Sequence, residues 1–299
     1  LTTVTTITYA GSGGLAFLLD SDHATTATSN ATLNLTNTSI STASYEIRGV
    51  EGGLGANDYK ITSAGAMNLA NASLSGILTI DVDTTNTAAD LTVNNATNFT
   101  YDSGSTNTVT ITGNSGNTTD IISSNGLDLT DVVLTNILSV IIDSGAGQST
   151  LTIDTNTDLS TDPVSVTGGG SDDRILFNET GTYSFANHTV IGVSTLVFNG
   201  TGANTLRVNQ ADINDVTTIT GNTGVDTITT NDASIDFTGI TLTSIDNIFT
   251  LNGSGTTFTG SSGNDIITGN SGADTFNGSA GNDTHDGSSD AAADTFKFI

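Results

Sequence analysis

Apolar residues recur at a fixed distance from glycine and aspartate near the C-terminal end of the sequence. Three consecutive nine-residue segments each begin with glycine and carry aspartate at the sixth position: 260–268, 269–277 and 278–286. An apolar residue stands two positions after the aspartate in the first two, Ile267 and Phe276. Alternate residues of a strand face opposite sides, so the aspartate and this apolar residue both point inward. The spacing predicts a glycine loop followed by a short strand, and two segments make one coil of a roll.

Similar loops occur upstream at wider spacing, beginning at residues 52, 113, 168 and 221. After the loops at 113 and 221, apolar residues recur at matching steps. A long repeat made of short strands and glycine turns indicates a solenoid or β-helix-like stack. Chance similarity in a chain rich in Thr, Asn, Ser and Gly is the alternative, but the recurring order of the apolar positions argues against it. We therefore predict a strand-rich, β-solenoid-like region over 1–257 and a roll over 258–299.

Composition favours an all-β fold. The 299 residues are 35% hydrophobic, which supplies material for a sizeable core. Only three of the 31 acidic residues are glutamate, and aspartate favours turns where glutamate favours helices. Abundant Thr, Val and Ile favour strands. The predicted fold class is an all-β, β-helix-like stack that ends in a parallel β-roll.

The formal net charge of -26 excludes one class of partner and suggests another. Five basic residues cannot neutralise a run of phosphates, so we expect no binding to nucleic acid. Acidic surfaces also aid solubility, which is the simpler reading of the charge. Many of the aspartates, however, lie in glycine loops, where carboxylates can meet a cation, and calcium prefers such oxygen-only sites.

The sequence has no cysteine and therefore no disulfide or thiolate metal site. No run of 18 apolar residues occurs, so we expect no insertion into a membrane. The chain begins with leucine, from which we expect a fragment or a processed form.

Residues 260–298 resemble the calcium-binding RTX, or haemolysin-type, nonapeptide repeat, and the closing DTFKF at 294–298 is similar to the ends of such arrays. The close resemblance covers about 40 residues. It implies a parallel β-roll whose loops alternate between two edges, with Ca²⁺ between each loop and the next-but-one loop. It also implies type I secretion of an unfolded chain, which folds on calcium outside the cell.

The resemblance also implies which residues hold calcium. Asp265 and Asp283 would share one edge of the roll, and Asp274 would share the other edge with Asp294 or Asp290. The leading glycines are expected to allow the sharp turn that turns carbonyl oxygens inward: Gly260, Gly269 and Gly278. The array departs from the family pattern at the second glycine position and at one apolar position: Ser261, Asn270, Ser279 and His285.

Two single upstream loops provide further candidate ligands. Asp226 closes the loop that begins at 221, and Asp173 closes the one that begins at 168. Ordinary turns without metal are the alternative for both. The alternative is stronger for Asp173, because the adjacent Arg174 could neutralise its carboxylate.

The sequence lacks common catalytic signatures. It contains neither H-E-x-x-H nor G-x-S-x-G, and it has no cysteine nucleophile. The three histidines, His23, His188 and His285, lie in unrelated contexts, where a structural role is the usual one. Pairs of aspartates arise freely in so aspartate-rich a chain and lack aromatic platforms for a sugar. We therefore expect a protein that is not an enzyme.

These observations predict a calcium-stabilised structural protein of a bacterial cell surface, such as a surface-layer (S-layer) or filament subunit. Its expected partners are further copies of itself and, second, a cell-surface polysaccharide. Two alternatives remain open: the stalk or binding module of a secreted RTX adhesin, and the non-catalytic part of a secreted enzyme. The uncharged opening segment 1–10 is strand-like, so it either pairs with another chain or forms the first coil of its own stack.

Overall fold

The computed structural model places the chain in two compact units, Leu1–Ser165 and Val166–Ile299. It describes residues 6–7, 15–19, 31–34, 39–40, 45–49, 59–63, 67–70, 72–75, 79–82, 91–93, 109–113, 119–123, 125–142, 147–155, 164–169, 172–185 and 188–297. Strands dominate both units, and all the strand pairs are parallel where their register is defined. The predicted all-β, solenoid-type fold is confirmed.

The first unit contains short parallel strands in several sheets. In the order of their hydrogen bonding, its described strands are β1 (Thr6–Ile7) and β4 (Ser39–Ile40); β2 (Leu15–Leu19), β5 (Tyr45–Gly49) and β8 (Ala72–Ser75); β14 (Val132–Thr135), β11 (Val109–Thr112), β9 (Thr79–Val82), β6 (Tyr59–Ser63) and β3 (Ala31–Asn34); β15 (Ile137–Ile142), β12 (Thr119–Ser123), β10 (Leu91–Val93) and β7 (Met67–Asn68); β13 (Leu127–Asp128) and β16 (Thr150–Ile153).

The second unit is described almost completely. Its first strand pair is β17 (Ser165–Gly168) with β20 (Val190–Ile191). The third sheet, as we call it, contains β18 (Asp173–Phe177), β21 (Val193–Phe198), β23 (Thr218–Thr220) and β26 (Thr241–Thr243). The long sheet contains β19 (Thr182–Ser184), β22 (Asn204–Arg207), β24 (Asp226–Thr230), β27 (Asn247–Thr250), β29 (Ile266–Thr268) and β31 (Thr284–Asp286). The short sheet contains β25 (Ser234–Asp236), β28 (Thr257–Thr259), β30 (Thr275–Asn277) and β32 (Thr295–Lys297).

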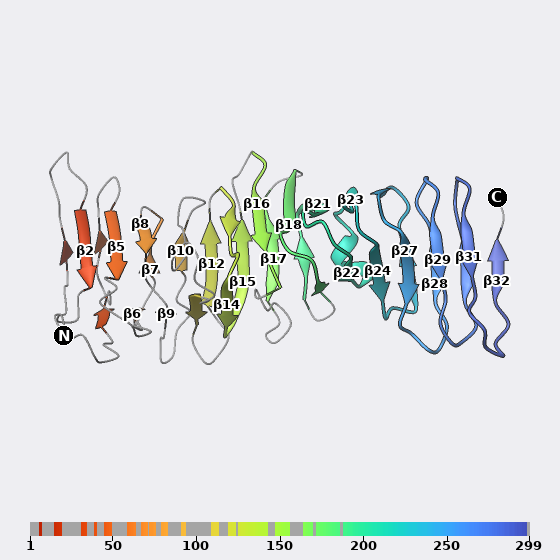
Figure 1. Cartoon of the computed structure of the whole chain (residues 1–299), viewed down its shortest axis with the longest axis horizontal. Helices are drawn as coiled ribbons and strands as arrows, with labels where there is room; N and C mark the ends of the chain where they lie inside the picture. The colour runs from red at the N-terminus through yellow and green to blue at the C-terminus, as the bar shows by residue number, and fades with distance from the viewer. Residues whose placement is uncertain are drawn as a thin grey trace. The chain divides into compact units, whose positions relative to one another are not determined.

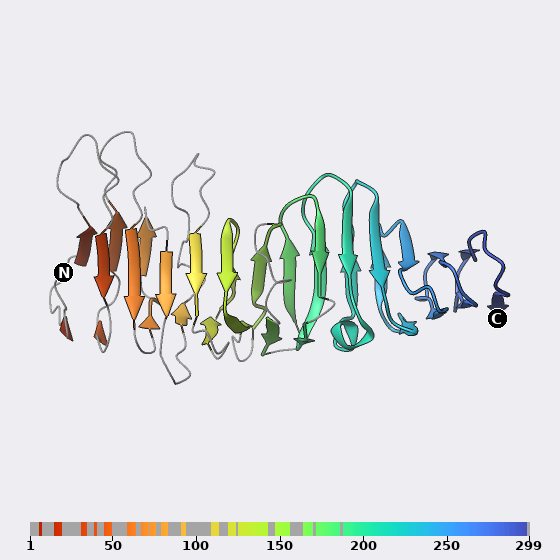
Figure 2. The ribbon, with the colours of Figure 1, turned by 90° about the horizontal axis from the view of Figure 1, so that it is seen from below.

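The coils of the second unit change from three sides to two along the chain. Up to β27, each coil supplies a strand to the third sheet and one to the long sheet, and its third side is closed by β20, by the 3-10 helix η1 (Gln210–Ile213) or by β25 (Figures 1 and 2). After β27 the chain alternates between the long and short sheets alone. We call residues 166–250 the three-sided coils and residues 251–297 the roll.

Hydrogen bonds between successive coils show the difference in coil length. In the three-sided coils, the hydroxyl of Thr217 donates to the carbonyl of Ser194 across a separation of 23 residues. In the roll, the N–H of Asp265 donates to the Asp283 carboxylate across a separation of 18 residues. The 18-residue coils of the roll are shorter because they lack a third side, whereas its last coil, from Asp274 to Asp294, spans 20 residues, as does the three-sided coil from Asp226 to Asp246.

Alternation along the strands places one set of side chains inside. Ile228 and Ile267 of the long sheet are fully buried, as their spacing from aspartate predicts. In the three-sided coils Phe177 packs against three other rings, Tyr183, Phe185 and Phe198. In the described part of the roll, the buried apolar side chains are Phe258, Ile267 and Phe276. The roll therefore has a thin core.

The structural repeat is the coil and not the longer spacing seen in the sequence. The loop at 168 lies between β17 and the third sheet, whereas the loop at 221 lies between the third and long sheets. The chain between these two loops therefore covers two coils and one further side. The loops at 52 and 113 lie largely outside the described residues.

Two other predictions concern the opening segment of the chain and the boundary between its two predicted regions. β1 pairs with β4 of the same chain, which favours the first-coil alternative for the opening segment; the rest of residues 1–10 lies outside the described residues. The predicted boundary between 257 and 258 falls inside the second unit and stays a prediction.

Candidate metal centre

Asp265 and Asp274 are each held by the loop that they close. Asp265 immediately precedes β29, and its Oδ2 accepts the N–H of Ser261 at 2.8 Å. In the same way Asp274 Oδ2 accepts the N–H of Asn270 at 3.2 Å. A carboxylate that accepts an amide four residues back closes the turn locally, as aspartates do in turns.

The first position of each loop requires glycine because a Cβ there would clash with the aspartate, and not because of its backbone angles. A Cβ on Gly260 would lie 2.6 Å from Asp265 Oδ2, and those on Gly269 and Gly278 would collide with Asp274 and Asp283. The left-handed backbone angles occur at the fourth position of the loop instead, with φ of 123° at Gly272 and 132° at Gly281. The expected positive φ of the loop glycines is thus found at the fourth position of two loops, and the assignment of the leading glycines to the metal site stays a prediction.

Asp265 and Asp283 meet on one edge of the roll. The N–H of Asp265 donates to Asp283 Oδ1 at 3.0 Å. Asp265 is 4% exposed, and Asp283 is half-buried. The structure thus brings together the two residues that the sequence assigned to one edge, and their role as metal ligands stays a prediction.

The other edge of the roll carries Asp274 with both of its alternative partners. The N–H of Asp274 donates to Asp294 Oδ1 at 2.9 Å, and the N–H of Gly272 donates to Asp290 Oδ2 at 2.8 Å. Asp294 therefore matches the position of Asp274 in the coil, whereas Asp290 matches that of Gly272. Asp274 is 1% exposed and also accepts the N–H of Thr256 at 2.7 Å.

Asp226 continues the Asp265 edge into the three-sided coils, but its carboxylate is occupied by N–H donors. Its Oδ1 accepts the main-chain N–H of Asn204 at 3.0 Å and the side-chain Nδ2 at 2.8 Å. Its Oδ2 accepts the N–H of Asn222 at 2.5 Å. Asp226 is fully buried. These contacts favour a structural role over that of a calcium ligand.

The same edge contains Asp246, which sequence reasoning missed. Asp246 Oδ2 accepts the N–H of Asp226 at 2.7 Å across 20 residues. Asp246 does not close a G-x-x-G-x-D loop, so only the coil length could have identified it. Asp173, the other upstream candidate, is buried at the start of β18 in the third sheet, where its Oδ2 accepts the N–H of Gly169 at 2.7 Å. It therefore does not share an edge with Asp226.

Burial and like charge act together on Asp265. Burial raises the pKa of Asp265, the hydrogen bonds from Ser261 lower it, and the nearby Asp283 carboxylate raises it again. A cation at this edge would relieve the repulsion between the two carboxylates.

Backbone oxygens are further possible donors at the loops. A Cβ on Gly281 would meet the carbonyl oxygen of Gly263 and would lie 3.2 Å from Asp283 Oδ1. A Cβ on Gly272 would lie 2.9 Å from the carbonyl oxygen of Gly253. No group of three or more His, Cys, Asp or Glu side chains that could hold a metal forms among the described residues. Each edge thus offers paired carboxylates and main-chain carbonyls, an oxygen-only set that fits calcium.

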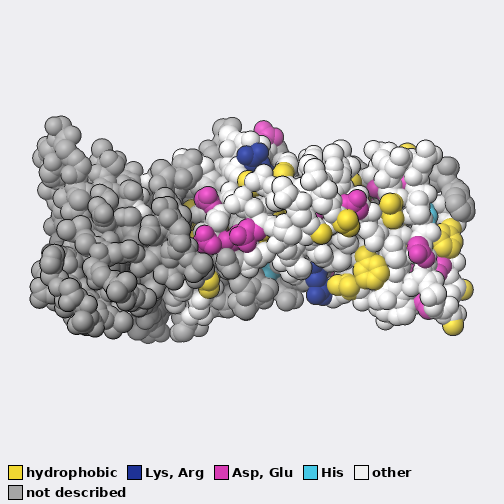
Figure 3. All heavy atoms as spheres, viewed as in Figure 1, with side chains coloured by type: hydrophobic (Ala, Val, Ile, Leu, Met, Phe, Trp, Pro, Cys, Tyr) yellow, Lys and Arg dark blue, Asp and Glu magenta, His cyan; other side chains and the backbone are white. Residues whose placement is uncertain are grey.

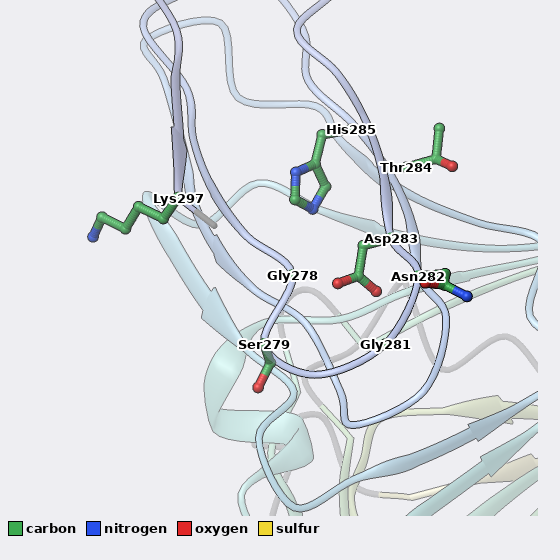
Figure 4. A pocket seen from close by; sticks show the side chains of 8 residues that line it. All are labelled: Gly278, Ser279, Gly281, Asn282, Asp283, Thr284, His285 and Lys297. Carbon is green, nitrogen blue, oxygen red and sulfur yellow. The ribbon is translucent and has the colours of Figure 1, made fainter. Parts of the chain in front are cut away.

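A hollow of about 420 Å³ adjoins the loop that contains Asp283. Figure 4 shows the Asp283 carboxylate and the His285 ring on its inner side, and Lys297 extending away. His285 occupies the apolar position of its strand and stacks on Phe276, with ring centroids 5.5 Å apart. An imidazole there substitutes for an apolar side chain in the column of rings, although its buried Nε2 has no hydrogen-bond partner among the described residues.

A comparison with family models identifies a calcium-binding repeat in the roll. Among the described residues, no helix has the length and apolar character needed to cross a membrane. A family model described as the RTX calcium-binding nonapeptide repeat (4 copies) matches residues 252–285. The match includes Asp265, Asp274 and Asp283, and it excludes Asp294 and the upstream candidates. No curated protein and no solved structure matches the chain.

Proposed function

Because this chain carries RTX calcium-binding nonapeptide repeats, we propose that it is a non-catalytic extracellular structural protein whose roll folds when calcium binds. We further propose that copies of it assemble on a bacterial cell surface as an S-layer or filament. The observation that carries the proposal is the pairing of buried or half-buried aspartates along both edges of the roll.

The candidate ligands fall into two sets. On one edge, Asp265, Asp283 and the carbonyl of Gly263 would hold one ion. On the other edge, Asp274 and Asp294 would hold a second, with the carbonyl of Gly253 nearby. Calcium, when bound, supplies the positive charge that the facing carboxylates lack. The protein provides the turn geometry, because each carboxylate is already oriented by an amide of its own or the preceding coil.

Calcium dependence fits an extracellular protein. RTX repeats are typical of secreted proteins, and the roll has too few buried apolar side chains to replace the cation. A ligand that binds only the folded state stabilises it by mass action. We propose type I secretion as the route, in line with the sequence resemblance.

A structural role is supported by how the histidines are used. His188 is 8% exposed, and the His285 ring stacks in the ring column of the roll, so packing accounts for both positions. Self-assembly is supported by the parallel sheets of the second unit, which present rows of side chains in register.

Sedimentation velocity and electron microscopy of the full chain across a calcium titration test this function. We expect a monomer in chelator and ordered assemblies at about millimolar calcium, the range of extracellular calcium modules. Magnesium at the same concentration is the control, and it should not produce assemblies because it demands a tighter octahedral site. A chain that stays monomeric at millimolar calcium and high protein concentration contradicts the assembly role.

A further inference from the structure

The outer face of the long sheet carries a row of side chains in strict register. Pairing between neighbouring strands aligns Arg207 with Thr229, Thr229 with Phe249, Phe249 with Thr268, and Thr268 with Asp286. The neighbours of these residues in sequence, such as Ile228 and Ile267, point inward and are buried. We call these five outward residues the Phe249 row.

The centre of the row is apolar and packed. Thr229 is only 7% exposed although it faces outward, as expected where the longer side chains of Arg207 and Phe249 stand on either side of it. Ile266 beside the row is 48% exposed, and Leu251 just after β27 is 41% exposed. Figure 3 shows this region as yellow apolar atoms beside a dark-blue basic side chain. Exposed apolar residues next to arginine are typical of the centre of a protein interface.

Arg207 lacks a counter-charge among the residues that the structure describes. It forms no ion pair with any residue that the structure describes, and its buried Nε has no hydrogen-bond partner there. The chain has 31 acidic residues and only five basic ones, so a second copy is a ready source of carboxylate. Arg207 is partly exposed, so its guanidinium can form an ion pair with a carboxylate of a partner.

The charges of the row are placed symmetrically about Phe249. Arg207 lies two strands before Phe249 and Asp286 two strands after it, about 9.5 Å away on either side for ordinary strand spacing. When two such sheets face each other, a two-fold axis that runs between them over Phe249, parallel to the strands, places each Arg207 opposite the Asp286 of the other copy. The same axis brings the two Phe249 rings together.

We propose that a second copy of this chain docks on the Phe249 row in this two-fold arrangement. The contact is isologous, because both copies use the same surface. This inference rests on the proposed self-assembly and names one surface through which it occurs. The strands are only three to five residues long, so the interface is small and the association weak and concentration-dependent.

A charge swap in the full chain tests the proposal. Arg207→Glu and Asp286→Arg each place like charges opposite one another, and we expect each to weaken calcium-dependent dimerisation at least about tenfold in sedimentation equilibrium. The double variant restores the opposite charges and should return dimerisation to within about threefold of the parent. Calcium binding and circular dichroism of each variant establish that the roll is folded.

Matched controls exist on the short sheet. Asp236→Arg removes an aspartate that, like Asp286, accepts the N–H of the residue two positions later, and Lys297→Glu makes the same charge change as Arg207→Glu. Both controls should dimerise like the parent. If the single variants dimerise as well as the controls, or if the double variant dimerises as weakly as the single variants, the proposed interface is wrong. The proposal of self-assembly would stand in either case. A parent chain that never associates in calcium overturns both proposals.

Discussion

The three-sided coils and the roll belong to one unit but are stabilised differently. A coil of 23 residues encloses several apolar columns, including the ring cluster around Phe177. A coil of 18 residues has at most one inward apolar side chain per strand and uses the rest of its length for glycine loops. Shortening the coil therefore exchanges hydrophobic burial for oxygen-lined edges. The comparison supports the proposal that the roll depends on a cation where the coils depend on their core.

The same residue type serves different purposes in the two regions. In the coils, Asp226 is surrounded by N–H groups of Asn204 and Asn222, which satisfy its charge without metal. In the roll, the Asp265 carboxylate accepts hydrogen bonds from Ser261 of its own loop, and the nearby Asp283 carboxylate raises its pKa. Similar loops in sequence thus differ in what the neighbouring coil presents to them.

The largest expected difference is between Asp265→Asn and Asp226→Asn. Removing one carboxylate from the roll edge should lower calcium affinity roughly 100-fold, because ligand charge sets the affinity of such sites. Asp226→Asn should leave that affinity unchanged and destabilise the coils by about 1–3 kcal/mol through lost hydrogen bonds. Calorimetric calcium titration and thermal melts in chelator separate the two effects. A drop in calcium stoichiometry for Asp226→Asn contradicts the contrast.

Two glycines with left-handed angles provide a second comparison. Gly239 has a φ of 83° and open space around it, so Gly239→Ala should cost the coils only the about 1–2 kcal/mol of a left-handed alanine. Gly281 has a φ of 132°, and its Cβ would also meet the Gly263 carbonyl. Gly281→Ala should therefore cost a further 1–3 kcal/mol, roughly, and raise the calcium concentration needed to fold the roll. Equal effects of the two substitutions on the calcium midpoint contradict this account.

Acid should strengthen the coils through Asp212 in η1. Burial raises the pKa of Asp212 from 3.8 to about 6, so the folded protein holds a proton that the unfolded chain releases. This contribution is fully present below about pH 4 and is lost as the pH rises through about 6. Between pH 7.5 and pH 4.5, Asp212 should add about 1–2 kcal/mol to the free energy of unfolding of the parent. We expect the Asp212→Asn variant to lack this gain. Denaturant melts of both proteins in chelator measure it, and identical pH slopes refute the assignment.

The smallest expected effect is a gain in the roll. Ser279 stands in the second glycine position of its loop with a φ of 70°, which is unfavourable for a residue with a Cβ. Ser279→Gly should stabilise the calcium-bound roll by about 1 kcal/mol. Ser261, at the equivalent position of an earlier loop, is not left-handed among the backbone angles of the described residues, so Ser261→Gly is the matched control and should not stabilise. A stability gain for both variants would contradict the backbone explanation.

The sequence pattern predicts the local features of this molecule better than it predicts the contacts between coils. The nine-residue spacing places Ile267 and Phe276 inside, because this depends only on strand alternation, and the family resemblance places Asp265 and Asp283 on one edge. The pattern misses Asp246, because this residue reaches the Asp226 edge through a coil of 20 residues and no sequence motif indicates that length. It also cannot show that Asn204 occupies the Asp226 carboxylate, since that contact joins residues 22 positions apart. The change from three sides to two is similarly invisible before the strands are paired.

Amide hydrogen exchange of the full chain, with calcium and with chelator, tests the central claim most directly. The account predicts that amides of residues 260–297 lose their protection in chelator, while those of the three-sided coils, such as Leu206 and Ile219, keep theirs. Restoring calcium should return protection to the roll alone. Protection of the roll that persists in chelator, or loss of protection in both regions together, contradicts a division between core-stabilised coils and a calcium-stabilised roll.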